Sequence, residues 1–476
     1  MKVTICLDRL SALLLCVLVA TISPCATAED PPQQQFLFTN VMVFDGSSEQ
    51  LYNADVLVTG NKIDQVSNEP LDVIASTTMT VIDGGGRTLM PGLIDAHVHL
   101  NLMLLDNPQG IVGANLMTWE EIGALAVQAA QEYVYSGFTT VRDLCGASTG
   151  LRKHVDAGTI DGPRIYLSGA CISQGSGHGD WRLESAVVRQ SSGELSHVER
   201  LGLTVIADGP DEVLKAARNN LASGADFTKM MAGGGVSSDR DPLTSIQGTM
   251  EELEAMSTAN RHFGTIGAVH AYMDVSVERA LTAGILSIEH GNLMSNPSTF
   301  KLMKEKDGWV VPAMAGFSAQ LLEHPYYGNP ENPAYAKAKT LIDNRDTWIE
   351  LAKKFEVNVG YGTDVVVSTI TASRGARDFQ MSQFAEAFGN FRTLKMMTSD
   401  NGRLMALTGD MNPYPGKLGV IEPGAYADII LVDGNPIQDI TVLGAAAEMF
   451  GTPRKTIGIP TVPFVMKDGK IYRNEL

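Results

Sequence analysis

Two closely spaced histidines in an apolar segment are the first residues that could do chemistry. The segment "LMPGLIDAHVHL" carries His97 and His99 near its end. In a β-strand, residues i and i+2 point to the same side, so both imidazoles would face one direction. Neutral imidazole is a common metal ligand, and the pair therefore indicates half of a metal site. Two hydrogen-bonded interior histidines would also explain the pattern, because a buried polar group needs only a partner.

Polar side chains also end four later apolar segments: Lys229 in "FTKMMAGGG", His270 in "AVHAY", His290 in "SIEHGN" and Asp364 in "GYGTD". A lysine in a buried strand is costly unless it is paired or modified. Lys229 could form a salt bridge to a carboxylate such as Asp364, or it could serve as a Schiff-base lysine. With four histidines converging, a third role fits better, in which the amine takes up carbon dioxide. The resulting carbamate is an anion that can bridge two metals.

The elements that must position these residues alternate between strand and helix patterns. Thr118 with Glu121, and Thr249 with Glu252, are typical of capping boxes at helix starts. We expect eight strands over residues 89–368, ending near His99, Asp143, Ile172, Met231, His270, His290, Ala313 and Asp364. Such alternation predicts a (β/α)8 barrel, the TIM barrel, with its site at the carboxyl ends of the strands. A doubly wound sheet is the alternative, although no glycine-rich dinucleotide motif follows the first strand.

Both ends of the chain have β patterns instead. Residues 36–88 contain short apolar segments separated by Asp-Gly, Gly-Asn and Gly-Gly turn signals. The C-terminal segments "GAYADIILVDGNP" and "TVPFVMKDGKIYRNEL" repeat the pattern, with Asp468-Gly469 as a hairpin turn. We therefore predict a small β-sandwich domain built from residues 29–88 and 407–476, with the barrel over residues 89–406.

The first 28 residues differ from the rest of the chain. Lys2 and Arg9 flank the start, the apolar run "LSALLLCVLVATI" follows, and "ATA" ends at Ala28. This order predicts a secretory signal peptide, because the run is short for a membrane span. Lipoprotein processing at Cys25 is the alternative. We expect export to the periplasm or the medium, with no membrane anchor in the mature form.

Cysteine usage and charge narrow the class of protein. Only Cys145 and Cys171 follow the predicted signal peptide, so we expect no disulfide scaffold, and we favour free thiols over a bond between these two. The 476 residues carry a net charge of −18 with no basic run, which argues against nucleic acid and anionic membranes as partners.

These motifs together resemble the amidohydrolase superfamily. "MPGLIDAHVHL" looks like its first-strand motif, and the four later polar residues match its later positions in order. "KLGVIEPGAYADIILVDGNPIQDI" is similar to the segment that returns the chain to the β domain. The segments "SGACISQGSGHGD", "HAY" and "AGILSIEHGN" resemble one branch of this superfamily. That branch contains Xaa-Pro dipeptidases, carboxypeptidase-like dipeptidases and the amidases that hydrolyse ochratoxin A.

The resemblance implies a binuclear site with the ligands His97, His99, Lys229, His270, His290 and Asp364. The first two histidines and Asp364 would hold one metal, and the other two histidines the second. Lys229, as N6-carboxylysine, and a hydroxide would bridge them. Zinc suits such a site, and manganese or cobalt could substitute. The implied reaction is hydrolysis of the amide bond to a C-terminal amino acid, with Asp364 as general base and then acid.

The substrate would be a small amide or dipeptide, and superfamily members often form homo-oligomers. Tyr272 follows His270 by two residues and could bind a carboxylate or an oxyanion, or simply pack at the rim. His178 in "GSGHGD" matches a loop histidine that lies near the substrate in related enzymes. Arg142 could bind a substrate carboxylate, although an ion pair with Asp143 is the simpler interpretation. The motif "MAGGGVSSDRDP" could let backbone approach a ligand. We interpret four histidines as surface residues: His154, His197, His262 and His324.

Three other functions remain as alternatives. A cyclic-amide hydrolase, of the imidazolonepropionase type, is compatible with the same ligands. Deaminases of the superfamily usually lack the bridging lysine and carry His-x-x-Glu after the fifth strand. This chain has "HAYMD", with Met273 at the glutamate position. A non-catalytic binding homologue would have no reason to keep all six metal positions.

Overall fold

The computed structural model describes residues 33–72, 78–104, 110–186, 194–238, 241–366 and 368–476. Residues Gln34–Leu476 form one unit, to which the description below refers. The predicted signal peptide, with Cys25, lies outside the described residues. None of the helices in the described ranges is both long enough and apolar enough to cross a membrane.

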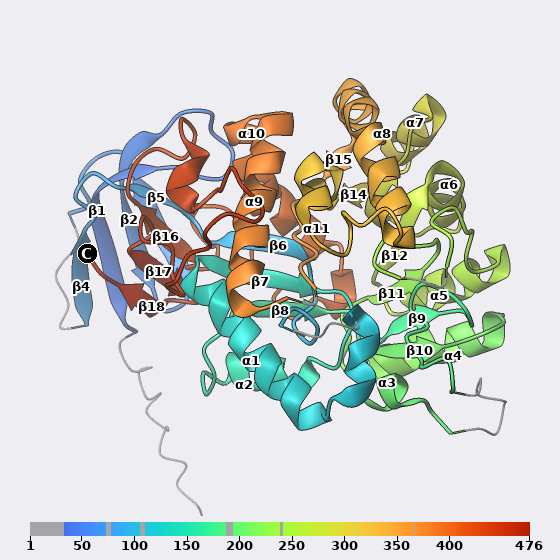
Figure 1. Cartoon of the computed structure of the whole chain (residues 1–476). Helices are drawn as coiled ribbons and strands as arrows, with labels where there is room; N and C mark the ends of the chain where they lie inside the picture. The colour runs from blue at the N-terminus through green and yellow to red at the C-terminus, as the bar shows by residue number, and fades with distance from the viewer. Residues whose placement is uncertain (1–32, 73–77, 105–109, 187–193, 239–240, 367) are drawn as a thin grey trace, which may run out of the picture. The chain divides into compact units, whose positions relative to one another are not determined.

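Parallel strands from the middle of the chain form the predicted (β/α)8 barrel (Figure 1). One sheet has the order β6 (Leu93–Val98), β7 (Phe138–Asp143), β8 (Arg164–Leu167). The other has the order β10 (Thr204–Ile206), β9 (Cys171–Ser173), β11 (Thr228–Met231), β12 (Gly267–Met273), β13 (Ser287–Leu293), β14 (Trp309–Val311), β15 (Asn358–Val359). Backbone hydrogen bonds join the two sheets at both pairs of edges. Asp226 N donates to Leu167 O at 2.8 Å, and Ala96 N donates to Tyr361 O at 2.9 Å.

Helices connect the barrel strands and cover them. They are α1 (Trp119–Tyr135), α2 (Thr149–Asp156), α3 (His197–Arg200), α4 (Pro210–Ala222), α5 (Met250–His262), α6 (Asp274–Thr282), α7 (Pro297–Glu305), α8 (Pro333–Phe355), α9 (Ile370–Phe388), α10 (Asn390–Lys395) and α11 (Asn401–Ala406). The capping box of Thr249 and Glu252 begins α5, as predicted. Thr118 caps α1 by accepting from Glu121 N, without a reciprocal contact from the glutamate side chain.

Five strand ends differ from the sequence prediction. β12 and β13 continue three residues past His270 and His290, to Met273 and Leu293. The third strand is interrupted, because Gly169 at φ +70° separates β8 from β9, which carries Ile172. β14 ends at Val311, before Ala313, since Pro312 has no N–H for the ladder. β15 is short, and Asp364 lies beyond its end in irregular backbone.

Strands from both termini form the predicted β-sandwich, seen in Figure 1 as blue and red arrows side by side. Its strands are β1 (Gln35–Val43), β2 (Tyr52–Thr59), β3 (Lys62–Ser67), β4 (Met79–Asp83), β5 (Thr88–Pro91), β16 (Ile429–Val432), β17 (Phe464–Lys467) and β18 (Lys470–Asn474). The sheet order is β18-β17-β16-β5-β1-β2-β3, with β4 beside β1. β3 and β16 are not neighbours in this order, yet Ile63 N on β3 donates to Ala425 O, shortly before β16, at 2.9 Å. The sheet therefore curves back on itself around an apolar core. Asp468 and Gly469 form the predicted turn between β17 and β18.

The two cysteines that follow the predicted signal peptide are bonded. Cys145 lies just after β7, and Cys171 begins β9. Their Cα atoms are 5.0 Å apart, and the sulfur atoms form a disulfide. The preference for free thiols was therefore wrong. That prediction did not consider that the barrel brings the end of β7 close to the start of β9.

Candidate metal centre

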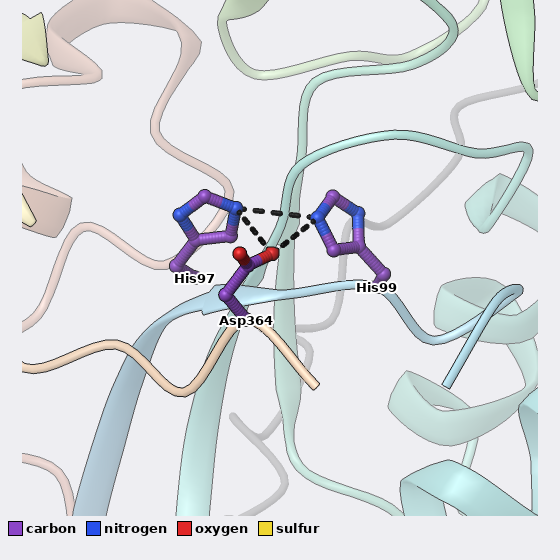
Figure 2. A group of neighbouring side chains, drawn as sticks. All are labelled: His97, His99 and Asp364. Carbon is purple, nitrogen blue, oxygen red and sulfur yellow. Dashed lines mark hydrogen bonds and ion pairs between the residues drawn. The ribbon is translucent and has the colours of Figure 1, made fainter. Parts of the chain in front are cut away.

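Three predicted ligands meet at the carboxyl end of β6 (Figure 2). Nε2 of His97 lies 3.2 Å from Nε2 of His99, and these two nitrogens lie 3.2 Å and 3.1 Å from Oδ1 of Asp364. Both imidazoles are buried, at 1 % and 8 % exposure. Two nitrogens and one carboxylate oxygen pointing at a common centre form the donor set of a divalent transition metal.

Backbone geometry aims these side chains at one another. His97 lies in β6, and His99 directly follows the last residue of that strand, Val98. Asp364 has φ +51°, which is uncommon for a residue with a side chain, and its N–H donates to His97 O at 2.8 Å. Gly362 lies so close that a Cβ there would come 2.6 Å from His97 Cβ. Strained backbone of this kind concentrates at functional sites.

The remaining two histidines lie on the neighbouring strands β12 and β13. The rings of His270 and His290 are 4.4 Å apart, and His290 lies 5.1 Å from the ring of His97. His290 has φ +75°, and its Nδ1 is 3.7 Å from Asp364 Oδ2. Nε2 of His270 is 3.1 Å from Gly234 O, a contact that needs a proton on Nε2. The lone pair of His270 is therefore on Nδ1.

Electrostatics favour metal-binding forms of these histidines. Burial lowers the pKa of His270 and His290 well below the ordinary value, and it lowers the pKa of His99 to about 4. They are therefore neutral at pH 7, as metal ligation requires. Burial also lowers the pKa of His97, but Asp364 and other carboxylate contacts outweigh it and raise the pKa overall. The orphaned Nδ1 of His290, which has no hydrogen bond in the described structure, also fits a site completed by ions.

Lys229 lies on β11 with 1 % exposure. No carboxylate of the described residues is within ion-pair distance of its Nζ, so the predicted alternative of a salt bridge to Asp364 is not formed. Burial lowers its pKa to about 8. The three-residue cluster of Figure 2 does not include Lys229, His270 or His290. All six predicted ligands nevertheless line one cavity of about 1330 Å³.

Two of the three residues predicted to contact the substrate, Tyr272 and His178, also line this cavity. Tyr272 stacks on His290, with ring centres 4.9 Å apart, and it is 6 % exposed. His178 stacks on His270 at 4.1 Å. The cavity wall contains no arginine among the described residues, and Lys229 is its only lysine there. The cavity volume of about 1330 Å³ exceeds the range of typical ligand pockets, about 300–1,000 Å³.

Arg142 lies behind the metal ligands and does not line the cavity. It is 1 % exposed, and its Nη2 donates to Glu289 at 2.7 Å. The sequence suggested Asp143 as its partner, but Arg142 pairs with Glu289 instead. Glu289 in turn places Oε2 3.0 Å from His97 Nδ1. Sequence reasoning missed this glutamate, although a carboxylate inside the buried strand "SIEHGN" was a visible signal.

The four histidines interpreted as surface residues have different environments. His154 and His262 are exposed, and His197 is half-buried, with Nε2 2.7 Å from Met117 O. His324 is exposed at the cavity rim, where its ring lies 5.8 Å from that of Phe450. Sequence patterns gave no signal for His324, because the rim combines segments that are far apart in the chain.

Comparisons with known proteins support the resemblance to amidohydrolases that the sequence motifs indicated. A profile of the Amidohydrolase family matches residues 88–472. The ochratoxinase of Aspergillus niger is 29 % identical over 443 residues, which cover 91 % of this chain and 85 % of the relative. A prolidase structure complexed with N-methylphosphonate-L-proline has a TM-score of 0.78 at 27 % identity, covering 93 % of this chain and 100 % of that one. A Xaa-Pro dipeptidase with bound methionine has a TM-score of 0.76 at 29 % identity, with the same coverage.

Proposed function

From the premise that the chain belongs to the amidohydrolase family and is a metal-dependent hydrolase of carbon–nitrogen bonds, we propose a finer activity. It cleaves the amide bond to a C-terminal amino acid in a dipeptide or an acyl amino acid. The observation that carries this proposal is the convergence of six predicted ligands on one cavity. Relatives named ochratoxinase, prolidase and Xaa-Pro dipeptidase support amide substrates of this kind.

The proposed ligand sets follow the chain's own geometry. His97, His99 and Asp364 would hold one divalent ion, most suitably zinc, and His270 and His290 would hold a second. Lys229 would bridge them as N6-carboxylysine. Its amine suits that modification, because a pKa of about 8 leaves roughly a tenth of it neutral at pH 7, and the neutral amine reacts with carbon dioxide. When bound, such ions lower the pKa of water and polarise a carbonyl.

Side chains of the site would handle the protons and the substrate. Asp364 accepts a proton from the attacking water and passes it to the leaving amine, so it serves first as base and then as acid. Its carboxylate is ionised, since His97 and His290 outweigh burial and hold its pKa well below the ordinary value. Tyr272 and His178 lie on the cavity wall, where they can contact the substrate. Arg142 would act indirectly, through Glu289.

A hydrolysis panel tests the proposed function. It combines Xaa-Pro and Xaa-Phe dipeptides, their C-terminally amidated forms, an aromatic acyl-phenylalanine and a lactam. We expect the free acids to be hydrolysed faster than the amidated forms. Equal rates on both forms would contradict recognition of the C-terminal carboxylate. Preferred turnover of the lactam would favour the cyclic-amide hydrolase, which shares the ligand set.

We further propose that the enzyme is exported and that it assembles as a homo-oligomer. The order of charged, apolar and small residues over positions 1–28 supports export. Sequencing the N-terminus of the mature protein tests the cleavage after Ala28. Sedimentation of the purified protein tests the oligomeric state.

A further inference from the structure

The segment after β11 carries the glycine-rich motif "MAGGGVSSDRDP". The sequence analysis expected this backbone to approach a ligand, and in the structure it packs against the side chain of His178. A Cβ at Gly235 would come 1.9 Å from Cε1 of the His178 imidazole. Glycine at this position therefore makes room for the histidine ring.

Two side chains of this segment hold one nitrogen of that ring. Nδ1 of His178 lies 2.8 Å from Ser238 Oγ and 3.5 Å from Asp241 Oδ2. Asp241 is 3 % exposed, and the same oxygen accepts from Gly235 N at 2.9 Å and from Gln247 Nε2 at 3.3 Å. Gln247 Oε1 accepts from His178 N at 2.8 Å. A carboxylate facing Nδ1 favours the tautomer with its proton on that nitrogen.

Helix α8 anchors the segment from outside. Nζ of Lys337 donates to the carbonyl oxygens of Gly235, Ser238 and Asp241, at 2.9, 2.6 and 2.8 Å. Both partners of His178 Nδ1 therefore have their backbone tied to a rigid element. A supporting group held in this way can fix a side chain before substrate arrives.

The other ring nitrogen of His178, Nε2, is available to a ligand in the cavity. His178 lines the cavity and stacks on His270, and no hydrogen bond from the described residues reaches its Nε2. With the proton on Nδ1, Nε2 carries the lone pair and can accept a hydrogen bond.

We propose that Asp241, together with Ser238, is a positioning residue for His178. It fixes the ring orientation and the tautomer, so that Nε2 presents its lone pair to a hydrogen-bond donor of the substrate. The inference rests on the proposed function, because it takes His178 as a substrate contact.

The first test does not depend on turnover. Long-range 1H–15N correlations of protein labelled with 15N-histidine report which ring nitrogen carries the proton, and His178→Ala identifies the signals of His178. We expect the Nδ1–H tautomer in the wild type and a mixture in Asp241→Ala and Ser238→Ala. An Nε2–H tautomer in the wild type would overturn the inference, whether or not the protein hydrolyses amides.

The second test is kinetic and uses the best substrate of the hydrolysis panel. We expect kcat/KM to fall about 10- to 100-fold in Asp241→Ala, as for other supporting groups of site histidines. Asp241→Asn should restore most of the activity, because its amide oxygen can take the place of Oδ2. The control Asp343→Asn, which removes an exposed carboxylate on α8 that does not line the cavity, should stay within about twofold of the wild type.

A double-mutant cycle separates positioning from general damage. Asp241→Ala should cost nothing further in the His178→Ala background, with metal content unchanged. An equal loss in both backgrounds would overturn the inference. If Asp241→Ala does not fold, Ser238→Ala gives the same comparison, since Ser238 is only half-buried. Absence of amide hydrolysis by the wild type would refute the proposed function and leave the tautomer result standing.

Discussion

At the scale of single residues, the site depends on groups whose ordinary charge states are costly in their surroundings. Lys229 is the clearest case, because its buried ammonium loses its hydration and the attraction of Glu289 and Asp364 offsets this loss only in part. Conversion to a carbamate between two cations would remove that cost. This is the physical reason for the proposed carboxylation of Lys229.

Replacing Lys229 tests this interpretation. We expect Lys229→Ala to lose both metal and activity, because the bridging anion disappears. Elemental analysis of the purified variant and the hydrolysis rate measure the two losses. Lys215→Ala on α4 is the control, because Lys215 is exposed and does not line the cavity. Two metal ions retained per chain in Lys229→Ala would contradict the bridging role.

The second residue-scale prediction concerns Glu289, which contacts His97 and pairs with Arg142. Glu289→Gln leaves a buried guanidinium unpaired, so the free energy of unfolding should fall by about 3–5 kcal/mol. Metal affinity should fall about 10- to 100-fold, because His97 loses its supporting carboxylate. Urea unfolding and metal titration measure the two effects.

A surface variant provides the contrast. Glu386→Gln removes one of the two exposed carboxylates that pair with Arg345, and we expect a change in the free energy of unfolding below about 1 kcal/mol. If Glu289→Gln were as mild as this control, the buried pair would not support the site.

At the scale of elements, the metal centre depends on close backbone packing between β6 and the segment after β15. Gly362 allows this approach, since a Cβ there would lie 2.5 Å from Val311 Cγ1 and 2.6 Å from His97 Cβ. Gly362 has no side chain, and this allows the segment after β15 to pack against His97 and set its position.

Gly362→Ala should destabilise the fold by about 1–3 kcal/mol through overpacking, and it should weaken metal binding by displacing His97. Thermal unfolding with and without added metal measures both effects. Gly123→Ala in α1 is the matched control, because a Cβ there meets nothing within 4 Å. That substitution should stabilise the protein by about 0.5–1 kcal/mol, since alanine has the higher helix propensity. Normal metal binding by Gly362→Ala would show that the contact is not needed.

At the scale of the whole molecule, one buried arginine connects the barrel to the sandwich. Arg164 on β8 pairs with Asp428 just before β16 and with Asp468 in the turn after β17. It also lies over the ring of Tyr426 at 3.9 Å. Charged residues that are far apart in the sequence thus meet where the barrel contacts the sandwich.

The pair with Asp468 predicts a pH dependence of stability. Burial raises the pKa of Asp468, but Arg164 outweighs this and holds the pKa below the ordinary value. The pair therefore stabilises the fold above about pH 4 and loses this effect as the pH falls through the folded-state pKa. Asp468→Asn keeps the turn, because asparagine also tolerates its φ of +55°.

We expect the variant to be less stable than the wild type by about 0.5 kcal/mol at pH 7, a small value because the aspartate is partly exposed. The difference should shrink toward pH 3. Urea unfolding at both pH values measures it. A difference that stays constant between them would mean that the charge of Asp468 is not responsible.

The sequence alone determined the fold class, and it predicted the six candidate ligands that line the cavity. Strand and helix patterns are local, and polar side chains such as His97, His270 and Asp364 end apolar segments where a barrel brings strand ends together. Tertiary structure decided what depends on distance between remote segments. Glu289 behind His97, the bond between Cys145 and Cys171, and the partners of His178 were not foreseen. Side-chain contacts across the barrel depend on strand register and closure, which no local pattern specifies.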